Sequence, residues 1–283
     1  MNTLVGLTCC LAAIAASWWR LKVVHDPVGM VGVLGGLGPA ASALLTQLIV
    51  SEGTRAGAEL DHEHARFLLL QDPMLPNSRL AAIGRGPSPH RGMLRAFRAM
   101  ARAGATKVCV CCNTAHPFAR TAAAKASVPF LDMVQLAADE ALKGSTASIS
   151  RPLHIGLLGT DATIRSGLYQ AALECAAERM FGSALCVKVV IPDDEGVAKV
   201  QGCILDIKHG TVKGIGRQIE SEALKLVSSG AERIITGCTE LPVCFNRESH
   251  PRFPVPIVSP TEILAKAIFQ EGRPKTQSAT ARK

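Results

Sequence analysis

The chain has 283 residues, of which 48% are hydrophobic, 19% charged and 4% aromatic, and its formal net charge is +8. This hydrophobic content excludes a fibrous or disordered chain, and the length allows one large or two small cores. No basic stripe interleaved with aromatic residues is present, so nucleic acid is not an expected partner. The mildly positive field instead suits a small anionic ligand.

Residues 1–27 are predicted to be a hydrophobic extension. Leu4 to Trp19 is a run of 16 residues without charge, close to the core of a signal peptide and shorter than the roughly 20 residues of a membrane-spanning helix. No Lys or Arg precedes the run, whereas Arg20 and Lys22 follow it. We interpret it as a candidate signal or anchor segment, and we expect no stable membrane partner for the core.

After the extension, strands alternate with helices, which predicts an α/β fold with parallel sheets. Strands are predicted, in chain order, at residues 28–34, 67–70, 108–111, 153–158, 187–191 and 233–236. Helices are predicted at residues 40–50, around Met93 to Met100, from about Pro117, at 166–180 and at 215–228. A glycine loop (35–39) follows the first strand, and a loop rich in Gly and Pro (84–89) precedes the second helix.

A pattern of Gly followed eight residues later by Cys occurs twice, as Gly104 to Cys112 and Gly230 to Cys238. The upstream strands are also alike, because Val-Gly-Val-Leu-Gly before Gly36 is matched by Ile-Gly-Leu-Leu-Gly before Thr160. The chain therefore reads as two similar domains related by internal duplication, each a short parallel sheet flanked by helices.

The predicted boundaries are residues 28–134 for domain 1, completed by 255–270, and 135–254 for domain 2, with a polar tail over 271–283. Ligands of open parallel sheets bind beyond the carboxyl ends of the strands. Cys112 and Cys238 follow such ends, so an active site is expected at the domain interface.

Ten cysteines in a chain of this length, without regular spacing, are expected to be reduced thiols rather than a disulfide framework. Two matched thiols suit a reaction that inverts a carbon centre, since one takes a proton and the other returns it on the opposite face. A helix beginning near each of Cys112 and Cys238 is expected to lower the pKa of its thiol. The other cysteines after residue 100 are expected to be small buried hydrophobes, with Cys109 and Cys111 on one strand face and Cys112 on the other.

Three motifs resemble those of the aspartate/glutamate racemase family, closest to its aspartate racemase branch. They are Gly35-Gly-Leu-Gly-Pro39, Cys112-Asn-Thr-Ala-His116 and Gly237-Cys-Thr-Glu-Leu241. The resemblance covers about Val28 to Gln270 and implies a racemase of acidic amino acids that needs no pyridoxal phosphate or other cofactor and no metal.

The resemblance also implies roles for individual residues. Cys112 and Cys238 would be the paired acid and base. The α-carboxylate and amino group of the substrate would be held by Asn113, Thr114, Thr160 and Thr239, with Leu37 lining the cleft and Lys208 reading the side-chain carboxylate. A homodimer is compatible with this reading, and the reduced thiols favour a cytoplasmic location.

Two positions depart from the family pattern. His62 stands where Arg or Gln is usual next to Asp61, at a position expected to read the distal end of the substrate, so the preferred amino acid stays open. Leu37 replaces a usual Met of similar volume, an exchange of small cost.

Two alternatives remain open. One is another reaction of the same superfamily, as in hydantoin racemase, maleate isomerase or arylmalonate decarboxylase, and the other is a carboxylate-binding protein without catalysis. Asn113, Thr114 and Thr239 could also be plain helix caps, and Lys208 a solvated lysine. His62, Glu63 and His64 lie too close together in a loop to indicate a metal.

Overall fold

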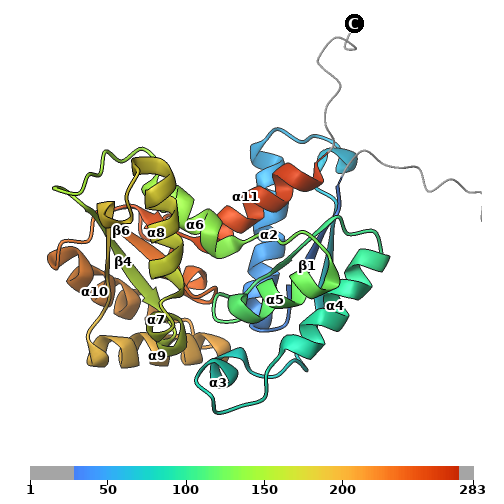
Figure 1. Ribbon diagram of the computed structural model, residues 1–283, viewed down its shortest axis with the longest axis horizontal. Helices are drawn as coiled ribbons and strands as arrows, with labels where there is room; N and C mark the ends of the chain where they lie inside the picture. Colours follow the sequence, from blue (N-terminus) through green and yellow to red (C-terminus); the bar gives the residue numbers. More distant parts are fainter. Residues whose placement is uncertain (1–28, 274–283) are drawn as a thin grey trace, which may run out of the picture.

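The structure, a computed structural model, describes residues 29–273. Within this range the strands form two parallel sheets, of order β2-β1-β3 and β5-β4-β6-β7 (Figure 1). The strands are β1 (Val31–Gly35), β2 (Phe67–Gln71), β3 (Lys107–Val110), β4 (Leu153–Gly159), β5 (Val187–Val190), β6 (Arg233–Gly237) and β7 (Ile257–Val258).

The α-helices are α2 (Pro39–Arg55), α3 (Ser78–Ala82), α4 (His90–Arg102), α5 (His116–Ala126), α6 (Met133–Leu142), α7 (Asp161–Arg165), α8 (Leu168–Phe181), α9 (Asp194–Lys208), α10 (Ile215–Ser228) and α11 (Pro260–Gly272). Short 3-10 helices are η1 (Asp61–Glu63), η2 (Ala184–Cys186) and η3 (Leu241–Val243).

The two halves repeat one arrangement, which confirms the predicted duplicated α/β fold. In each half the first strand is central: β1 pairs with β2 and β3, and β4 pairs with β5 and β6, all in parallel. The edge strand β7 pairs with β6 and extends the second sheet only.

The first sheet is covered on both faces, as parallel sheets require. Successive side chains of a strand point to opposite faces, so Leu34 packs with helices α4 and α5, whereas Val33 packs with α2 and α11. The same alternation divides the cysteines as predicted: Cys109 and Cys111 lie in the α2/α11 core and Cys112 in the α4/α5 core.

The second sheet is built in the same way, with α6 and α8 on one face and α9 and α10 on the other. Helices α6 and α11 lie between the halves, and α11 packs along α2 although the two are far apart in the sequence (Figure 1). We propose that α11 completes domain 1, with the division between the domains at residues 134 and 135. β7 lies within the segment 255–270 that was assigned to domain 1, but it pairs with β6 of the second sheet.

The predicted strands overlap the observed strands, and the helix expected over 166–180 is α8, which begins two residues later. Gly167, the residue before α8, adopts the left-handed conformation with φ 67° and separates α8 from the short helix α7. The sequence did not predict α3, α6, α7, α9, α11 or β7 as elements.

The candidate signal or anchor segment over residues 1–27 lies outside the described residues, as do residues 274–283. Among the helices of residues 29–273, none has the length and apolar character needed to cross a bilayer.

Asp132 joins the end of domain 1 to helix α6. Its carboxylate accepts hydrogen bonds from the backbone N–H groups of Val134 and Gln135 as the N-cap, and it pairs with Arg120 of α5. Burial acts to raise the pKa of Asp132, but the hydrogen bonds from Arg120, the nearby His116 and the helix amide together hold it below its usual value.

We predict that Asp132→Ala lowers the free energy of unfolding by about 2 kcal/mol at pH 7, since it removes a helix cap and a partly exposed ion pair. Because the folded pKa is depressed, this contribution is present above the unfolded pKa of about 4 and is lost as the pH falls through the folded pKa. Urea unfolding at pH 7 and in acid measures the difference. The exposed Glu140→Ala on the same helix is the control, and an equal loss in both variants would contradict the assignment.

Candidate active site

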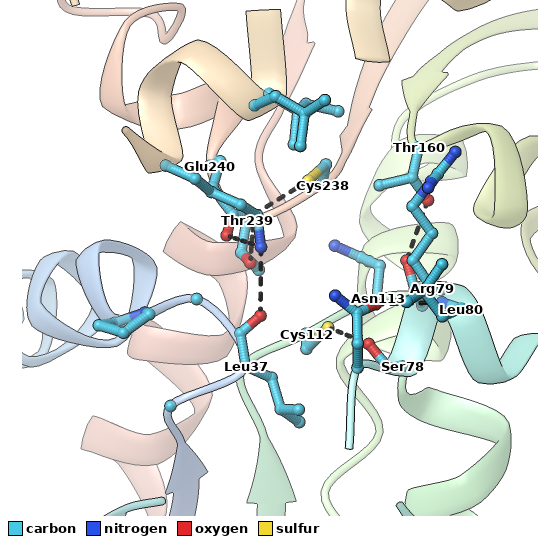
Figure 2. A pocket seen from close by; sticks show the side chains of 18 of the residues that line it. Leu37, Ser78, Arg79, Leu80, Cys112, Asn113, Thr160, Cys238, Thr239 and Glu240 are labelled. Atoms are coloured by element: carbon cyan, nitrogen blue, oxygen red, sulfur yellow. Dashed lines mark hydrogen bonds and ion pairs between the residues drawn. The ribbon is translucent and has the colours of Figure 1, made fainter. Parts of the chain in front are cut away.

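A cleft of about 440 Å³ lies at the carboxyl ends of the strands, between the two halves (Figure 2). Residues from both sheets line it, and Cys112 and Cys238 each follow the third strand of their half. Eight of the predicted site residues line this cleft, namely Leu37, Cys112, Asn113, Thr114, Thr160, Lys208, Cys238 and Thr239.

His62 is the predicted site residue that the structure does not bring to the cleft. It is exposed on η1 and is not among the cleft residues. The carboxylate of Glu63 accepts hydrogen bonds from the N–H groups of Glu59 and Leu60, which closes a tight turn that leaves His62 in solvent. The structure therefore does not bring His62 together with the other predicted site residues.

Cys112 is buried and lies beside a neutral partner. Its Sγ is 3.6 Å from the hydroxyl of Ser78, on α3. Burial raises the pKa of the Cys112 thiol, and the charge of Glu240 raises it further, whereas Ser78 and Lys208 act in the opposite direction.

Cys238 is buried beside a charged partner. Its Sγ donates to Oε2 of Glu240 at 3.0 Å. Burial raises the pKa of this thiol well above its ordinary value. The Glu240 carboxylate raises it further, because its charge repels the thiolate and it accepts a hydrogen bond from the protonated thiol.

The predicted lowering of both thiol pKa values is wrong. Helix α5 begins four residues after Cys112, and Cys238 is followed by the three-residue η3 rather than by an α-helix. A single backbone N–H, of Ala115 for Cys112 and of Glu240 for Cys238, acts to lower the pKa, and burial outweighs it in both cases. The resting thiols are therefore held protonated.

Glu240 is the charged centre of the cleft, and the sequence analysis did not select it although it lies in a quoted motif. Only 3% of its surface is exposed. It forms an ion pair with Nζ of Lys208 at 3.0 Å, besides accepting from Cys238. Burial acts to lower the pKa of Lys208, but the charge of Glu240 and the hydrogen bond to it more than offset this and raise it.

A side chain at Gly38, in the glycine loop after β1, would displace the carboxylate of Glu240. A Cβ on Gly38 would lie 2.1 Å from Oε1 of Glu240. The loop also contributes the carbonyl oxygen of Leu37, which lies 3.5 Å from Nζ of Lys208. Lys208 thus connects the second half of the molecule to the loop of the first.

Three threonine hydroxyls form one group across the interface. Oγ1 of Thr114 is 3.0 Å from that of Thr160 and 2.9 Å from that of Thr163. Thr160 also caps α7 through the N–H of Thr163. No side-chain cap involves Asn113, Thr114 or Thr239 at the adjacent helices, which rules out the helix-cap reading for them.

Asn113 has a fixed orientation that the sequence did not reveal. The hydroxyl of Tyr169, on α8, donates to Oδ1 of Asn113 at 2.6 Å. Nδ2 of Asn113 is buried and has no partner among the described residues. Because burial keeps the pKa of Tyr169 well above its ordinary value, this phenol stays a donor, and the Asn113 amide is left with a free N–H₂ beside the cleft.

The cleft is bridged by a second ion pair that joins its two sides. Arg79 of α3 donates to both carboxylate oxygens of Asp161 of α7, at 2.6 and 2.7 Å. This geometry is the strong, planar form of an arginine–carboxylate pair. It holds the short helix α3, which carries Ser78, next to the second half.

The cysteines in the described residues are free thiols. The expectation of buried thiols outside the cleft holds for Cys109, Cys111, Cys186 and Cys203 but is wrong for Cys175, which is exposed, and for Cys244, which is half-buried. Cys175 is exposed because it lies on the outer side of helix α8, and Cys244 is partly exposed because it lies at the end of η3. Among residues 29–273, no group of three His, Cys, Asp or Glu side chains is arranged to hold a metal ion.

Residues 34–268 match the model of the Asp/Glu/Hydantoin racemase family. The aspartate racemase of Picrophilus torridus has a similar structure, with a TM-score of 0.70 at 26% identity over 86% of this chain and 94% of its own. The broad specificity amino-acid racemase RacX of Bacillus subtilis is 23% identical over 84% of this chain and 96% of its own.

The glutamate racemase of Aquifex pyrophilus is 30% identical over 50% of this chain, a match that spans about half (48%) of the length of that relative. The family model, in contrast, extends from the first strand to the last helix. The chain belongs to the Asp/Glu/hydantoin racemase family.

Proposed function

We propose that this protein is a cofactor-independent amino-acid racemase in which Cys112 and Cys238 act as acid and base. The observation that carries the proposal is the placement of two buried thiols, from matched positions of the two halves, on one cleft. The family membership supports the same reaction class, since relatives in it are named as racemases of aspartate, glutamate and a broader set of amino acids.

The reaction needs one thiolate and one thiol at the same time. The thiolate takes the proton from Cα, the electron pair left behind spreads into the α-carboxylate, and the thiol on the opposite face returns a proton to Cα. The product has the opposite configuration, and the two sulfurs have exchanged roles. Because burial raises both thiol pKa values, a thiolate formed in the cleft is a stronger base than one in water, which suits the weakly acidic Cα–H.

Glu240 gives the two thiols different resting environments. The negative charge of the Glu240 carboxylate, which accepts a hydrogen bond from Cys238, opposes ionisation of that thiol. The hydroxyl of Ser78, in contrast, can donate a hydrogen bond to a thiolate at Cys112. Cys112 is therefore the thiol we expect to ionise first, with Cys238 as the proton donor of that half-reaction.

The α-carboxylate of the substrate is expected to accept from Asn113, whose N–H₂ group is buried beside the cleft without a partner in the described structure. The threonine group and Thr239 supply further hydroxyls. For aspartate or glutamate, the substrates that the sequence resemblance implies, Lys208 would have to exchange Glu240 for the side-chain carboxylate.

We predict that Cys112→Ser and Cys238→Ser each reduce racemisation at least 1,000-fold, because a hydroxyl is too weakly acidic to replace a thiol in proton exchange. Chiral chromatography of an amino acid that the wild type racemises measures the loss. Cys203→Ser, which changes a buried thiol outside the cleft, is the matched control and should keep wild-type activity. Wild-type rates in either of the first two variants would refute the two-thiol scheme.

The hydrogen bond from Tyr169 to Asn113 gives a second prediction. In Tyr169→Phe the amide is no longer held with its N–H₂ toward the cleft, so KM should rise about tenfold while kcat changes less than threefold, the size expected for one hydrogen bond to a charged group. Thr261→Val removes a buried hydroxyl of α11 outside the cleft and should leave KM unchanged. A fall in kcat with unchanged KM would show that Tyr169 does not act through substrate binding.

A further inference from the structure

A long stretch of the first half carries basic side chains and no acidic ones. Between Asp72 and Asp132 the sequence has nine Lys or Arg residues and no Asp or Glu. Three of the nine reach acidic partners outside the stretch, in the ion pairs Arg79–Asp161, Lys107–Glu271 and Arg120–Asp132. The other six are exposed, and within residues 29–273 none of them forms an ion pair: Arg85, Arg91, Arg95, Arg98, Arg102 and Lys125.

Four of these arginines lie in a row on helix α4, which we call the arginine stripe: Arg91, Arg95, Arg98 and Arg102. Spacings of four, three and four residues keep them within about 60° of one another around the helix axis and along roughly 16 Å of its length. The opposite side of the helix is buried through Met93, Phe97 and Met100. Helix α4 lies at the outer edge of the first half (Figure 1), so the stripe faces away from the protein.

The arginine stripe is unfavourable for the helix that carries it. Like charges three or four residues apart on a helix repel one another, and no acidic residue of α4 separates these arginines. Arg91 lies in the first turn, where the helix dipole favours acidic side chains, and that turn has none. A surface of mixed charge would avoid this repulsion, whereas an anionic partner laid along the helix would remove it.

The anionic surface of a lipid bilayer fits the arginine stripe better than a nucleic acid does. Nucleic-acid strands are bound by grooves in which basic residues alternate with aromatic side chains that stack on the bases. The aromatic residue of α4, Phe97, is buried on the side away from the stripe. Clusters of Lys and Arg are attracted to bilayers that contain anionic lipids without any such stacking.

The place where the described chain begins also supports a bilayer as the partner. The backbone N–H of Thr106, four residues after Arg102, donates to the carbonyl of Met30 at 2.8 Å. The uncharged run from Leu4 to Trp19 is separated from residue 29 by nine residues, which span at most about 30 Å when extended. The run is therefore attached within reach of the stripe. Apolar insertion and a basic patch on the same chain reinforce each other in membrane binding.

We propose that the arginine stripe of α4 binds the anionic headgroups of a lipid bilayer and holds the first half against the membrane surface. The guanidinium groups donate to headgroup phosphates. Within α4 no large apolar side chain is exposed, so the stripe itself does not insert, and its contact is electrostatic, reversible and weakened by salt. The inference goes beyond the proposed racemase function and does not depend on it.

The test measures how the full chain partitions onto sedimented lipid vesicles. Vesicles of phosphatidylcholine with about 30% phosphatidylglycerol are compared with vesicles of phosphatidylcholine alone, at roughly 100 mM NaCl. We expect at least about tenfold more binding to the anionic vesicles, and we expect this difference to disappear at about 1 M NaCl. Equal binding to both kinds of vesicle would overturn the inference, since the apolar run alone would then account for it.

Variants assign the binding to α4. Arg91→Gln, Arg95→Gln, Arg98→Gln and Arg102→Gln together should lower partition onto the anionic vesicles at least about tenfold. The same four positions changed to Lys keep the charge, so that variant should stay within about threefold of the wild type. A loss in the Lys variant as large as in the Gln variant would show that charge is not what binds.

The matched control makes the same change in net charge on the second half. It replaces four exposed basic residues by Gln: Lys188, Lys213, Arg217 and Arg252. Its partition should stay within about threefold of the wild type, because the charges removed do not face the bilayer. A loss equal to that of the stripe variant would overturn the inference, since net charge rather than α4 would then attract the bilayer.

A short duplex DNA is the competing probe, added at the same phosphate concentration as the anionic lipid. We expect the protein to stay on the vesicles. Displacement of most of the bound protein by the DNA would overturn the assignment to lipid and identify the arginine stripe as a nucleic-acid site.

Discussion

A buried carboxylate organises this cleft. A carboxylate removed from water is stable only when cations and donors surround it, and Glu240 meets this need with Lys208 from α9 and the thiol of Cys238. The glycine loop after β1 passes so close to the carboxylate that Gly38 has no room for a side chain. The glycine loop, helix α9 and the thiol of Cys238 thus all contact one buried charge.

The two halves repeat a fold but not an environment. β3 and β6 place their cysteines at equivalent strand ends, yet Cys112 lies beside a hydroxyl and Cys238 beside a carboxylate. A fully symmetric pair would have two thiols of equal acidity, with no preference for which one ionises. In the proposed mechanism, the different partners of the two thiols, rather than a difference in fold, decide which thiol rests as acid and which as base. The ion pair between Arg79 and Asp161 crosses the cleft and holds helix α3, which carries Ser78, the neutral partner of Cys112.

Much of the fold could be predicted because strands of a parallel sheet are continuous apolar runs ending in glycine, and the two runs before Gly36 and Thr160 repeat each other. The positions of Cys112 and Cys238 at the cleft could be predicted because each follows the carboxyl end of a strand. The segment over 194–208 did not read as a helix, because Gly196 and Gly202 interrupt its pattern, although Asp193 caps it and six of its residues are buried. The helix that carries Lys208 was therefore missed.

The electrostatics of the site could not be read from the sequence. The pKa of a thiol depends on how deeply it is buried and on which charge lies beside it, and neither the burial of Cys238 nor its contact with Glu240 is a property of spacing. His62 was misplaced for a similar reason, since its position depends on how Glu63 closes a turn with two backbone amides. The partner of Asn113 comes from α8 of the other half, 56 positions away.

The most direct measurement is the fate of solvent deuterium in the first turnovers, with an amino acid that the protein inverts and without added pyridoxal phosphate. If two thiols act on opposite faces, deuterium enters the product enantiomer while the remaining starting enantiomer keeps its Cα proton. Deuterium appearing in the starting enantiomer as fast as inversion would mean that one group serves both faces, and it would contradict the account.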